Sequence, residues 1–555
     1  MARSFSNLYR EQFIQEMSSQ QFDLLVIGGG ITGCGIALDA ALRGMKVALI
    51  EKNDFASGTS SRSTKLIHGG LRYLKQMEFK LVRDVGSERA VVHRNARHVV
   101  IPEKMLLPIV EGGSLGKLPT SVGLLVYDLL AGVKAEERRK MLDRHETYKA
   151  EPLLNTSGLL GGGLYFEYRT DDSRLVIELA KSAFANGALL LNYAESQKFV
   201  YDSAGKITAA IVKDHNTGNE FEIRAKVIVN ACGPWVDLLR KEDNSLKGKR
   251  LQLTKGVHLV FPYERLPLKQ AAYFDVGDGR MIFAIPRDNI TYVGTTDTVY
   301  NETIDNPNCT KADADYLLKA ANHMFPEAKL KLADIQSSWA GLRPLIHEDG
   351  KSASELSRKD EIMISTSGLI SIAGGKLTGY RLMAEKIVDL AEKKLGKKHV
   401  PSFTKHYRLS GGEFKSEEDF NYTRQQILKQ AEQAGISANI VSQWFYRYGC
   451  NTSFILERLP TNSSSSIENL LGAELGYSIE NEMTTRLTDF AIRRTSKIFF
   501  SRNETINHLP RLADIIAERL YVSTKEKQQL LDEVEKEFAQ VVQFSSPVYC
   551  PKILQ

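Results

Sequence analysis

The sequence predicts an α/β domain, an antiparallel-sheet domain whose segments interleave with it along the chain, and an all-α domain at the C-terminus. Three observations lead to this fold class. Residues 22–51 follow the order strand, glycine-rich turn, helix, strand, and residues 252–300 alternate in the manner of antiparallel strands. After residue 398 the strand signals fade and apolar residues recur at helical spacing. A chain of 555 residues is also too long for one hydrophobic core, so several domains are expected.

The first element predicts a nucleotide site. Gly28, Gly30 and Gly33 form a G-x-G-x-x-G motif between the apolar strand "FDLLVIG" and a small-residue helix that ends near Gly44. The free N–H groups at the start of that helix suit a pyrophosphate. Glu51 ends the second strand, where a carboxylate can accept hydrogen bonds from both ribose hydroxyls. These parts in register favour a bound dinucleotide over the alternative, a glycine-rich turn that only packs the elements together.

The later elements favour an extended cofactor such as FAD over NAD. A polar stretch, "SSRSTKLIHGGLRYL" over residues 60–74, follows the first unit where a plain NAD fold would continue into further βαβ units. The buried strand "KVIVNACGPW" then arrives late, and "LISIAGGKLTGY" over residues 369–380 offers a second helix N-terminus. We expect the cofactor to lie across the sheet with a flavin ring at its far end.

Composition and cysteine usage exclude several classes of protein. The net charge of +6 is a mild basic bias and predicts no nucleic-acid partner. Five cysteines without a C-x-x-C pair argue against disulfides and against zinc, and no other metal-ligand spacing occurs. The N-terminal residues lack an apolar signal region and no long uncharged apolar run follows, so we expect a cytoplasmic protein whose membrane contact, if any, is peripheral.

Several motifs together identify the family that the chain resembles. "VIGGGITGCGIALDAALRG", "TSSRSTKLIHGGLRYL", "VNACGPW", "VGTTD", "WAGLRPL" and "GGKLTGYR" are similar to those of the FAD-dependent glycerol-3-phosphate dehydrogenases, within the glutathione-reductase-like and D-amino-acid-oxidase-like flavoproteins. The resemblance implies a Rossmann-like FAD-binding domain in three parts, residues 20–76, 166–245 and 355–398. It implies a substrate or cap domain in two parts, residues 77–165 and 246–354. Residues 402–548 form the predicted helical domain.

The resemblance also implies which residues contact FAD. The serines and the "HGG" run of the polar stretch are expected along the pyrophosphate and beneath the flavin. Besides the three motif glycines, the expected contacts are Ile31, Thr32, Glu51, Lys52, Thr59, Ser60, Ser61, Ser63, Leu66, His68, Gly69, Gly70, Ala231, Gly233, Trp235, Gly341, Arg343, Gly375, Lys376, Leu377 and Thr378.

The implied substrate, glycerol 3-phosphate, is a dianion that needs several cationic donors. The family motifs place Arg72, Tyr73, Arg343, Arg358 and Lys376 at the substrate, and they give catalytic roles to His258, Arg343 and Lys376. His258 is the expected base, because a neutral imidazole titrates in the working range. Lys376, beside a helix N-terminus, is expected to stabilise negative charge on the reduced flavin.

Some of the residues named above also have a purely structural interpretation. Arg72 could pair with a carboxylate in the sheet region, and His258 could be a satisfied histidine of the core. His68 is expected to organise the backbone and not to catalyse.

The sequence leaves three functions open. The leading interpretation is oxidation of sn-glycerol 3-phosphate to dihydroxyacetone phosphate, with electrons passed to a membrane quinone at the inner face of the cell membrane. The second is an oxidase that uses O2, and the third is a non-catalytic binding protein on a flavoprotein scaffold. A homodimer is one assembly that the sequence leaves open.

Overall fold

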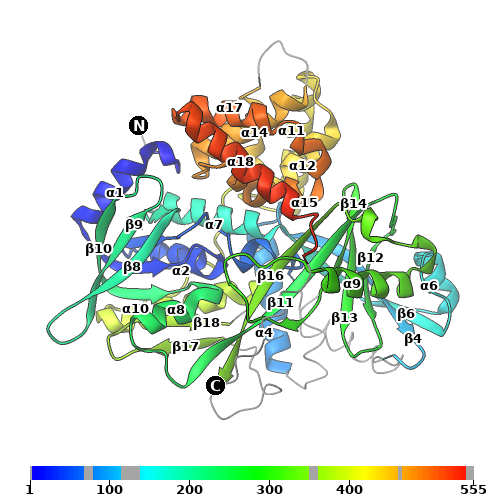
Figure 1. Cartoon of the computed structure of the whole chain (residues 1–555), viewed down its shortest axis with the longest axis horizontal. Helices are drawn as coiled ribbons and strands as arrows, with labels where there is room; N and C mark the ends of the chain where they lie inside the picture. The colour runs from blue at the N-terminus through cyan, green and yellow to red at the C-terminus, as the bar shows by residue number, and fades with distance from the viewer. Residues whose placement is uncertain are drawn as a thin grey trace.

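The computed structural model describes residues 3–67, 79–113, 138–348, 360–374, 376–459 and 466–545. Two β-sheets lie side by side, and a helical domain covers them at the top of Figure 1. The orange and red helices of the C-terminal domain lie above both sheets. They contact helix α7 (Asp172–Ala185), which packs on the first sheet, and strand β16 (Ser337–Glu348) of the second. The predicted fold class, an α/β domain, an interleaved sheet domain and an all-α C-terminal domain, is confirmed.

The first sheet has a parallel centre in the order β18, β10, β1, β2 and β7, with antiparallel strands added at the β17 edge and on β10. Its strands are β1 (Gln21–Ile27), β2 (Val47–Ile50), β7 (Leu189–Leu191), β8 (Ala194–Tyr201), β9 (Ile207–Asp214), β10 (Glu220–Asn230), β17 (Glu361–Ile364) and β18 (Ile370–Ala373). Strands β1 and β2 are buried almost throughout, as central parallel strands must be. The strand "KVIVNA", predicted as a late member of this sheet, pairs directly with β1.

Helices α2 (Ile31–Leu42), α7 (Asp172–Ala185) and α10 (Tyr380–Leu395) pack together against the first sheet, with α2 between the other two. Small residues of α2 allow this close packing, because a Cβ on Gly35 would lie 3.0 Å from the Tyr380 ring. Other helices of this region are η1 (Asn7–Tyr9), α1 (Arg10–Ser19), η2 (Thr59–Ser61), η4 (Gly233–Trp235), α8 (Val236–Glu242) and η8 (Leu377–Gly379).

The second sheet is antiparallel except where β12 runs parallel to β4. Its strands are β3 (Leu66–Ile67), β4 (Ile101–Val110), β5 (Lys140–Leu142), β6 (Leu159–Arg169), β11 (Lys249–Pro262), β12 (Ala271–Asp275), β13 (Met281–Arg287), β14 (Ile290–Gly294), β15 (Thr298–Val299) and β16 (Ser337–Glu348). The helices of this domain are α4 (Phe79–Asn95), α6 (Arg144–Ala150), α9 (Lys311–Met324), η5 (Pro326–Ala328) and η6 (Leu332–Asp334).

The C-terminal domain contains α11 (Glu417–Gln433), α12 (Ala438–Tyr448), η9 (Gly449–Asn451), α13 (Thr452–Leu456), α14 (Ile467–Asn481), η10 (Asp489–Arg494), α15 (Lys497–Phe500), α16 (Arg502–Ile506), α17 (Leu509–Leu520) and α18 (Thr524–Gln540). The helical spacing after residue 398 predicts regular helices, but residues 481–500 depart from this prediction. The structure has a π-helical turn, η10, and the short helix α15 in this segment. Arg493 and Arg494 of this segment form buried ion pairs with Asp54, which belongs to the domain of the first sheet.

Each of the two sheets is built from segments that are far apart in the sequence. The first sheet draws its strands from residues 20–76, 166–245 and 355–398, and the second sheet draws most of its strands from the two other segments. Strand β3 belongs to the second sheet although it lies within residues 20–76, and β6 continues beyond residue 165 to Arg169.

Candidate active site

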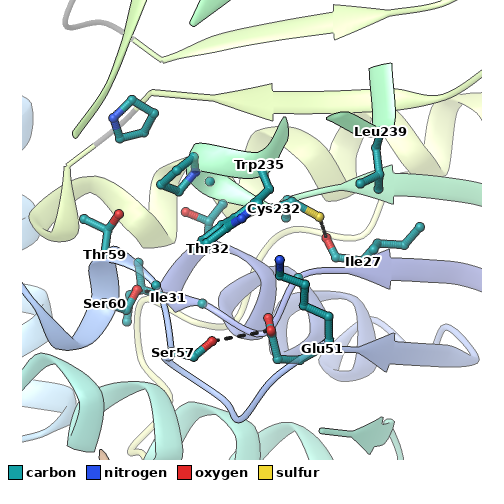
Figure 2. Close-up of a pocket in the computed structure, with 18 of the residues that line it drawn as sticks. Ile27, Ile31, Thr32, Glu51, Ser57, Thr59, Ser60, Cys232, Trp235 and Leu239 are labelled. Carbon is teal, nitrogen blue, oxygen red and sulfur yellow. Dashed lines mark hydrogen bonds between the residues drawn. The ribbon is translucent and has the colours of Figure 1, made fainter. Parts of the chain in front are cut away.

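A cavity of about 370 Å³ opens where the carboxyl ends of β1 and β10 meet the start of helix α2. Figure 2 shows Glu51 and Ser57 on one side of it, with Cys232, Trp235 and Leu239 opposite. Its lining includes these predicted residues: Gly28, Gly30, Ile31, Thr32, Glu51, Lys52, Thr59, Ser60, Ser63, Ala231, Gly233, Trp235, Lys376 and Leu377. Ligands of open α/β sheets bind at such carboxyl ends.

The glycine loop packs closely against neighbouring backbone atoms, and only residues without a side chain fit at its tightest positions. Gly28 has φ of +115°, and a Cβ there would lie 2.6 Å from the Ala231 carbonyl oxygen. A Cβ on Gly33 would lie 1.8 Å from the Gly28 carbonyl oxygen, so neither position accepts a larger residue. Helix α2 therefore starts directly at the cavity, and the Ser60 hydroxyl accepts a hydrogen bond of 3.1 Å from the Ile31 N–H. This arrangement suits a pyrophosphate at the helix N-terminus.

Glu51 lies immediately after β2 and is held by backbone groups. Its carboxylate accepts hydrogen bonds from the N–H of Gly29 at 2.7 Å and of Asn53 at 2.9 Å. Burial raises the pKa of Glu51, although the two backbone donors oppose this shift. The Ser57 hydroxyl lies 3.5 Å from the same carboxylate. The remaining lone pairs of Glu51 can accept the hydroxyls of a ribose.

The cavity lining combines two kinds of chemistry. Ala194, Cys232, Trp235 and Leu239 contribute apolar and aromatic surface, which suits a flat heterocycle. Other lining residues contribute hydroxyl groups, Pro344, Leu377 and the cation Lys376. This combination suits the adenine, the phosphates and the flavin of FAD.

Lys52 and Trp235 are joined at the rim of the cavity by Asp305 from the second domain. The Lys52 ammonium lies 2.6 Å from the Asp305 carboxylate, and the Trp235 indole donates to the same oxygen at 2.8 Å. Lys52 also lies over the Trp235 ring, 4.7 Å from its centroid. The loop after β15 therefore contacts two residues of the cavity lining and joins the two sheet domains there.

Arg343 and His258 lie on the paired strands β16 and β11, outside the cavity lining. The Arg343 guanidinium donates to Thr295 Oγ1 at 3.0 Å and pairs with Asp297 at 3.2 Å, while the following residue, Pro344, lines the cavity. His258 is buried; its Nε2 lies 3.0 Å from Thr64 Oγ1. Burial, with the charges of Arg343 and Lys65, lowers the pKa of His258 well below its usual value, so the ring is neutral.

Several other predicted residues do not reach the cavity wall. Gly33, Ser61, Leu66, Gly341 and Thr378 are absent from its lining among the residues that the structure describes. Ser61 is buried with its hydroxyl on the Gly58 carbonyl at 3.4 Å, and Gly341 makes room for Arg62, whose carbonyl oxygen lies 2.2 Å from a Cβ placed there. His68, Gly69, Gly70, Arg72, Tyr73, Arg358 and Gly375 lie outside the described residues.

Sequence reasoning missed part of the lining. The additional residues are Ile27, Ser57, Gly58, Asp172, Ala194, Glu195, Ser196, Cys232, Pro234, Leu238, Leu239, Glu242, Pro344 and Gly374. Strand β7 pairs in parallel with β2, so its carboxyl end lies beside that of β2, where Glu51 follows. Residues 194–196 come shortly after the end of β7 and therefore lie near Glu51. Their place in the lining follows from the sheet order, which the sequence did not reveal.

The residues present fit FAD. The glycine loop and the start of helix α2 offer N–H groups to a pyrophosphate, and Glu51 offers an acceptor to a ribose. Gly28 packs so closely against Ala231 that no side chain fits there. These features define an FAD-dependent oxidoreductase. Residues 23–381 match the family described as "FAD dependent oxidoreductase", and residues 402–527 match the "C-terminal domain of alpha-glycerophosphate oxidase".

Comparison with single proteins narrows the class. The chain is 50% identical to the aerobic glycerol-3-phosphate dehydrogenase of Bacillus subtilis (strain 168), over 97% of this chain and 98% of that protein. The solved glycerol-3-phosphate dehydrogenase from Bacillus halodurans, complexed with FAD, has a TM-score of 0.84 and 43% identity, covering 99% of this chain and 100% of that one. An FAD-bound L-alpha-glycerophosphate oxidase from Mycoplasma pneumoniae, at 20% identity and a TM-score of 0.53 over 70% of this chain and 98% of that one, shares the fold. The chain belongs to the FAD-dependent aerobic glycerol-3-phosphate dehydrogenases.

Proposed function

We propose that this enzyme oxidises sn-glycerol 3-phosphate to dihydroxyacetone phosphate and passes the electrons to a membrane quinone. The observation that carries the proposal is the likeness to aerobic glycerol-3-phosphate dehydrogenases over nearly the whole chain. The cavity, whose lining residues fit FAD and include Lys376, is consistent with it. Within the ranges that the structure describes, none of the helices combines the length and the apolar character needed to cross a membrane.

The phosphate of the substrate is proposed to bind the cationic residues Lys376 and Arg343. Lys376 lines the cavity, and Arg343 directly precedes the lining residue Pro344. Thr295 and Asp297 fix the orientation of the Arg343 guanidinium, so little side-chain entropy remains to be lost when it engages a phosphate oxygen. The family motifs add Arg72, and Arg358 more loosely, to this group.

Bound FAD supplies the hydride acceptor for the hydrogen on C2 of the substrate. We propose that His258 receives the proton of the C2 hydroxyl, directly or through Thr64. The ring is neutral, as a proton acceptor must be. A phosphate dianion beside Arg343 would offset the positive charge that now lowers the pKa of His258, and binding would therefore strengthen this base. Lys376 is proposed to stabilise the negative charge that arrives with the hydride.

The electron acceptor is tested by product stoichiometry. Dihydroxyacetone phosphate, hydrogen peroxide and quinol are measured in aerated buffer with and without a short-chain quinone. A quinone-linked dehydrogenase forms one quinol per substrate oxidised and little peroxide. Peroxide formed in equal amount to the product, whether or not quinone is present, would instead make the enzyme an oxidase. An absence of product under every condition would contradict the proposed substrate.

A further inference from the structure

The buried carboxylate of Asp54 joins the cofactor loop to the C-terminal domain. Asp54 lies in the middle of residues 51–57, the loop that begins with Glu51, and is fully buried. Arg494 donates to its two oxygens at 2.6 and 2.9 Å, and Arg493 donates its Nε–H at 2.6 Å. Burial alone would raise the pKa of Asp54, but the charges of Arg494 and Arg493 outweigh burial and lower it to about 2. Asp54 is therefore a permanent anion held by both guanidinium groups.

Both arginines belong to the π-helical turn η10, which also carries Asp489, the partner of Arg493. Arg493 donates to Asp489 at 2.7 Å, and the Tyr193 hydroxyl donates to the same carboxylate oxygen. Arg494 is fixed in turn by the Glu482 carbonyl, to which its Nη2 donates at 2.7 Å. Single π-helical turns inside helical proteins are often found at functional sites. Here the turn places two guanidinium groups on one carboxylate.

The loop that Asp54 anchors is bound at both of its ends to the glycine loop. The Glu51 carboxylate accepts from the Gly29 N–H at 2.7 Å, and the Ala56 N–H donates to the Gly29 carbonyl at 3.0 Å. The second contact of η10, from Asp489 to Tyr193, leads to another part of the cavity lining. Tyr193 donates its backbone N–H to the Asn53 carbonyl at 2.7 Å, and the next residue, Ala194, lines the cavity.

These contacts do more than attach one domain to another. The C-terminal domain is attached elsewhere by the buried pair of Arg174 with Glu482 at 2.6 Å, and by the hydroxyl of Ser337, which donates to the Phe499 carbonyl at 2.7 Å. Neither of those contacts includes the loop of residues 51–57. The arginines of η10 act on the segment that carries the ribose acceptor and supports Gly29.

We propose that Asp489, Arg493 and Arg494 are positioning residues for FAD, and that the C-terminal domain thereby sets the affinity of the cavity for the adenosine half of the cofactor. They act through Asp54 and Tyr193 on Glu51, Gly29 and Ala194. The inference rests on the assignment of the cavity to FAD. It is independent of the proposed substrate and acceptor, because its test measures cofactor binding without turnover.

The test compares the full-length apoprotein with its Arg494→Lys variant, which keeps the charge but loses the paired donation to Asp54. Dissociation constants for FAD and for ADP are measured by calorimetric or fluorescence titration, and thermal stability is measured in parallel. We expect both dissociation constants to rise at least tenfold in the variant. ADP is included because it occupies only the adenosine end, where Glu51 lies.

A matched control separates positioning from general destabilisation. Arg43 is also a buried arginine that pairs with carboxylates, including Asp39 at 2.6 Å, but it lies at the C-terminal end of α2, away from the glycine loop. Arg43→Lys is expected to lower thermal stability and leave both dissociation constants within twofold of the parent protein. Should Arg494→Lys fail to fold, Arg493→Lys, which retains the Arg494 pair, takes its place.

Three results would overturn the proposal. The first is parental FAD affinity in a folded variant at Arg494 or Arg493. The second is an equal loss of affinity in Arg43→Lys, which would mean that any destabilised core weakens binding. The third is a loss of FAD affinity with unchanged ADP affinity, which would place the effect away from Glu51.

Discussion

Glu51 and Gly29 are joined by a hydrogen bond of 2.7 Å, in which the backbone N–H of the glycine loop donates to the carboxylate at the end of β2. This one bond fixes the position of the expected ribose acceptor relative to the expected pyrophosphate site. Because parallel strands β1 and β2 pair in register up to Ile27 and Ile50, the two residues meet directly beyond the paired strands. The cofactor site is thus built by the order of the strands.

Replacing Glu51 by Ala is expected to weaken FAD binding roughly ten- to a hundredfold. The change removes the carboxylate that would accept hydrogen bonds from the ribose, and hydrogen bonds to a charged group are each worth about 1.5–3 kcal/mol. It also leaves the Gly29 N–H without its carboxylate acceptor. The measurement is the dissociation constant of FAD for the apoprotein. Glu195→Ala is the control, because Glu195 also lines the cavity but accepts hydrogen bonds from Gln197 and His215. Equal effects of the two substitutions would contradict the assignment.

Replacing Arg343 by Ala is expected to reduce kcat/KM for glycerol 3-phosphate by roughly 10- to 100-fold, because a charge-assisted hydrogen bond to the phosphate is lost. FAD affinity should change little, since Arg343 does not line the cavity. Arg265, which pairs with Asp334 at 2.9 Å in the same domain, provides the control substitution Arg265→Ala. Kinetics of Arg343→Ala that match the parent enzyme would remove Arg343 from the substrate site.

The Asp305 contact at the cavity mouth is expected to govern cofactor release more than stability. Its side chain is 67% exposed in the pair with Lys52, and exposed ion pairs contribute only about 0–1 kcal/mol. Asp305→Asn should therefore leave the melting temperature almost unchanged while FAD dissociates a few times faster. The rate is measured by stopped-flow, after the FAD-loaded protein is diluted into buffer without FAD. An FAD dissociation rate equal to that of the parent protein would show that the contact does not restrain the cofactor.

Glu242 makes a pH-dependent contribution to stability. Burial raises its pKa from the usual 4.5 to about 7, assisted by Asp243 and opposed by the backbone amide of Phe199. A carboxyl whose pKa is higher in the folded state binds more protons there, so this group destabilises the fold progressively as pH rises from about 4.5 to about 7. Glu242→Gln should stabilise the apoprotein above pH 7 by on the order of 1 kcal/mol after allowance for partial exposure.

The matching measurement is denaturation of parent and variant apoprotein across this pH range. The difference between them should shrink towards zero near the acid end, because the carboxyl of the parent is then protonated in both states. A difference that is constant with pH would show that the substitution acts through packing and not through ionisation.

Local patterns predicted the parts of the site that depend on short stretches of chain. The glycine motif, helix α2 and the position of Glu51 follow from one strand–helix–strand unit, and the structure places them together. Neighbouring hydroxyls were harder to assign. Ser60 reaches the cavity while Ser61 turns inward to Gly58, because a 3₁₀ turn directs adjacent side chains to different sides.

Long-range contacts could not be predicted from a single sequence. The pair of Asp54 with Arg494 joins residues 440 positions apart, and only the docking of two domains brings them together. The surroundings of His258 could not be predicted either. The alternation of β11 places its side chain on one face of the sheet but does not say which residues it meets there. In the structure it stacks on Trp339 of the neighbouring strand, with ring centroids 4.8 Å apart. Periodicity fixes that a strand exists, whereas the identity of the facing strand decides which side chains meet.

The central claim, that FAD in this cavity oxidises glycerol 3-phosphate, is tested most directly by anaerobic titration of the purified holoenzyme. Glycerol 3-phosphate is added while the visible absorption of the flavin is followed, with glycerol as the unphosphorylated control. We predict that the band bleaches with glycerol 3-phosphate, that one dihydroxyacetone phosphate forms per flavin reduced, and that glycerol has little effect. A flavin that stays oxidised with excess glycerol 3-phosphate would contradict the claim.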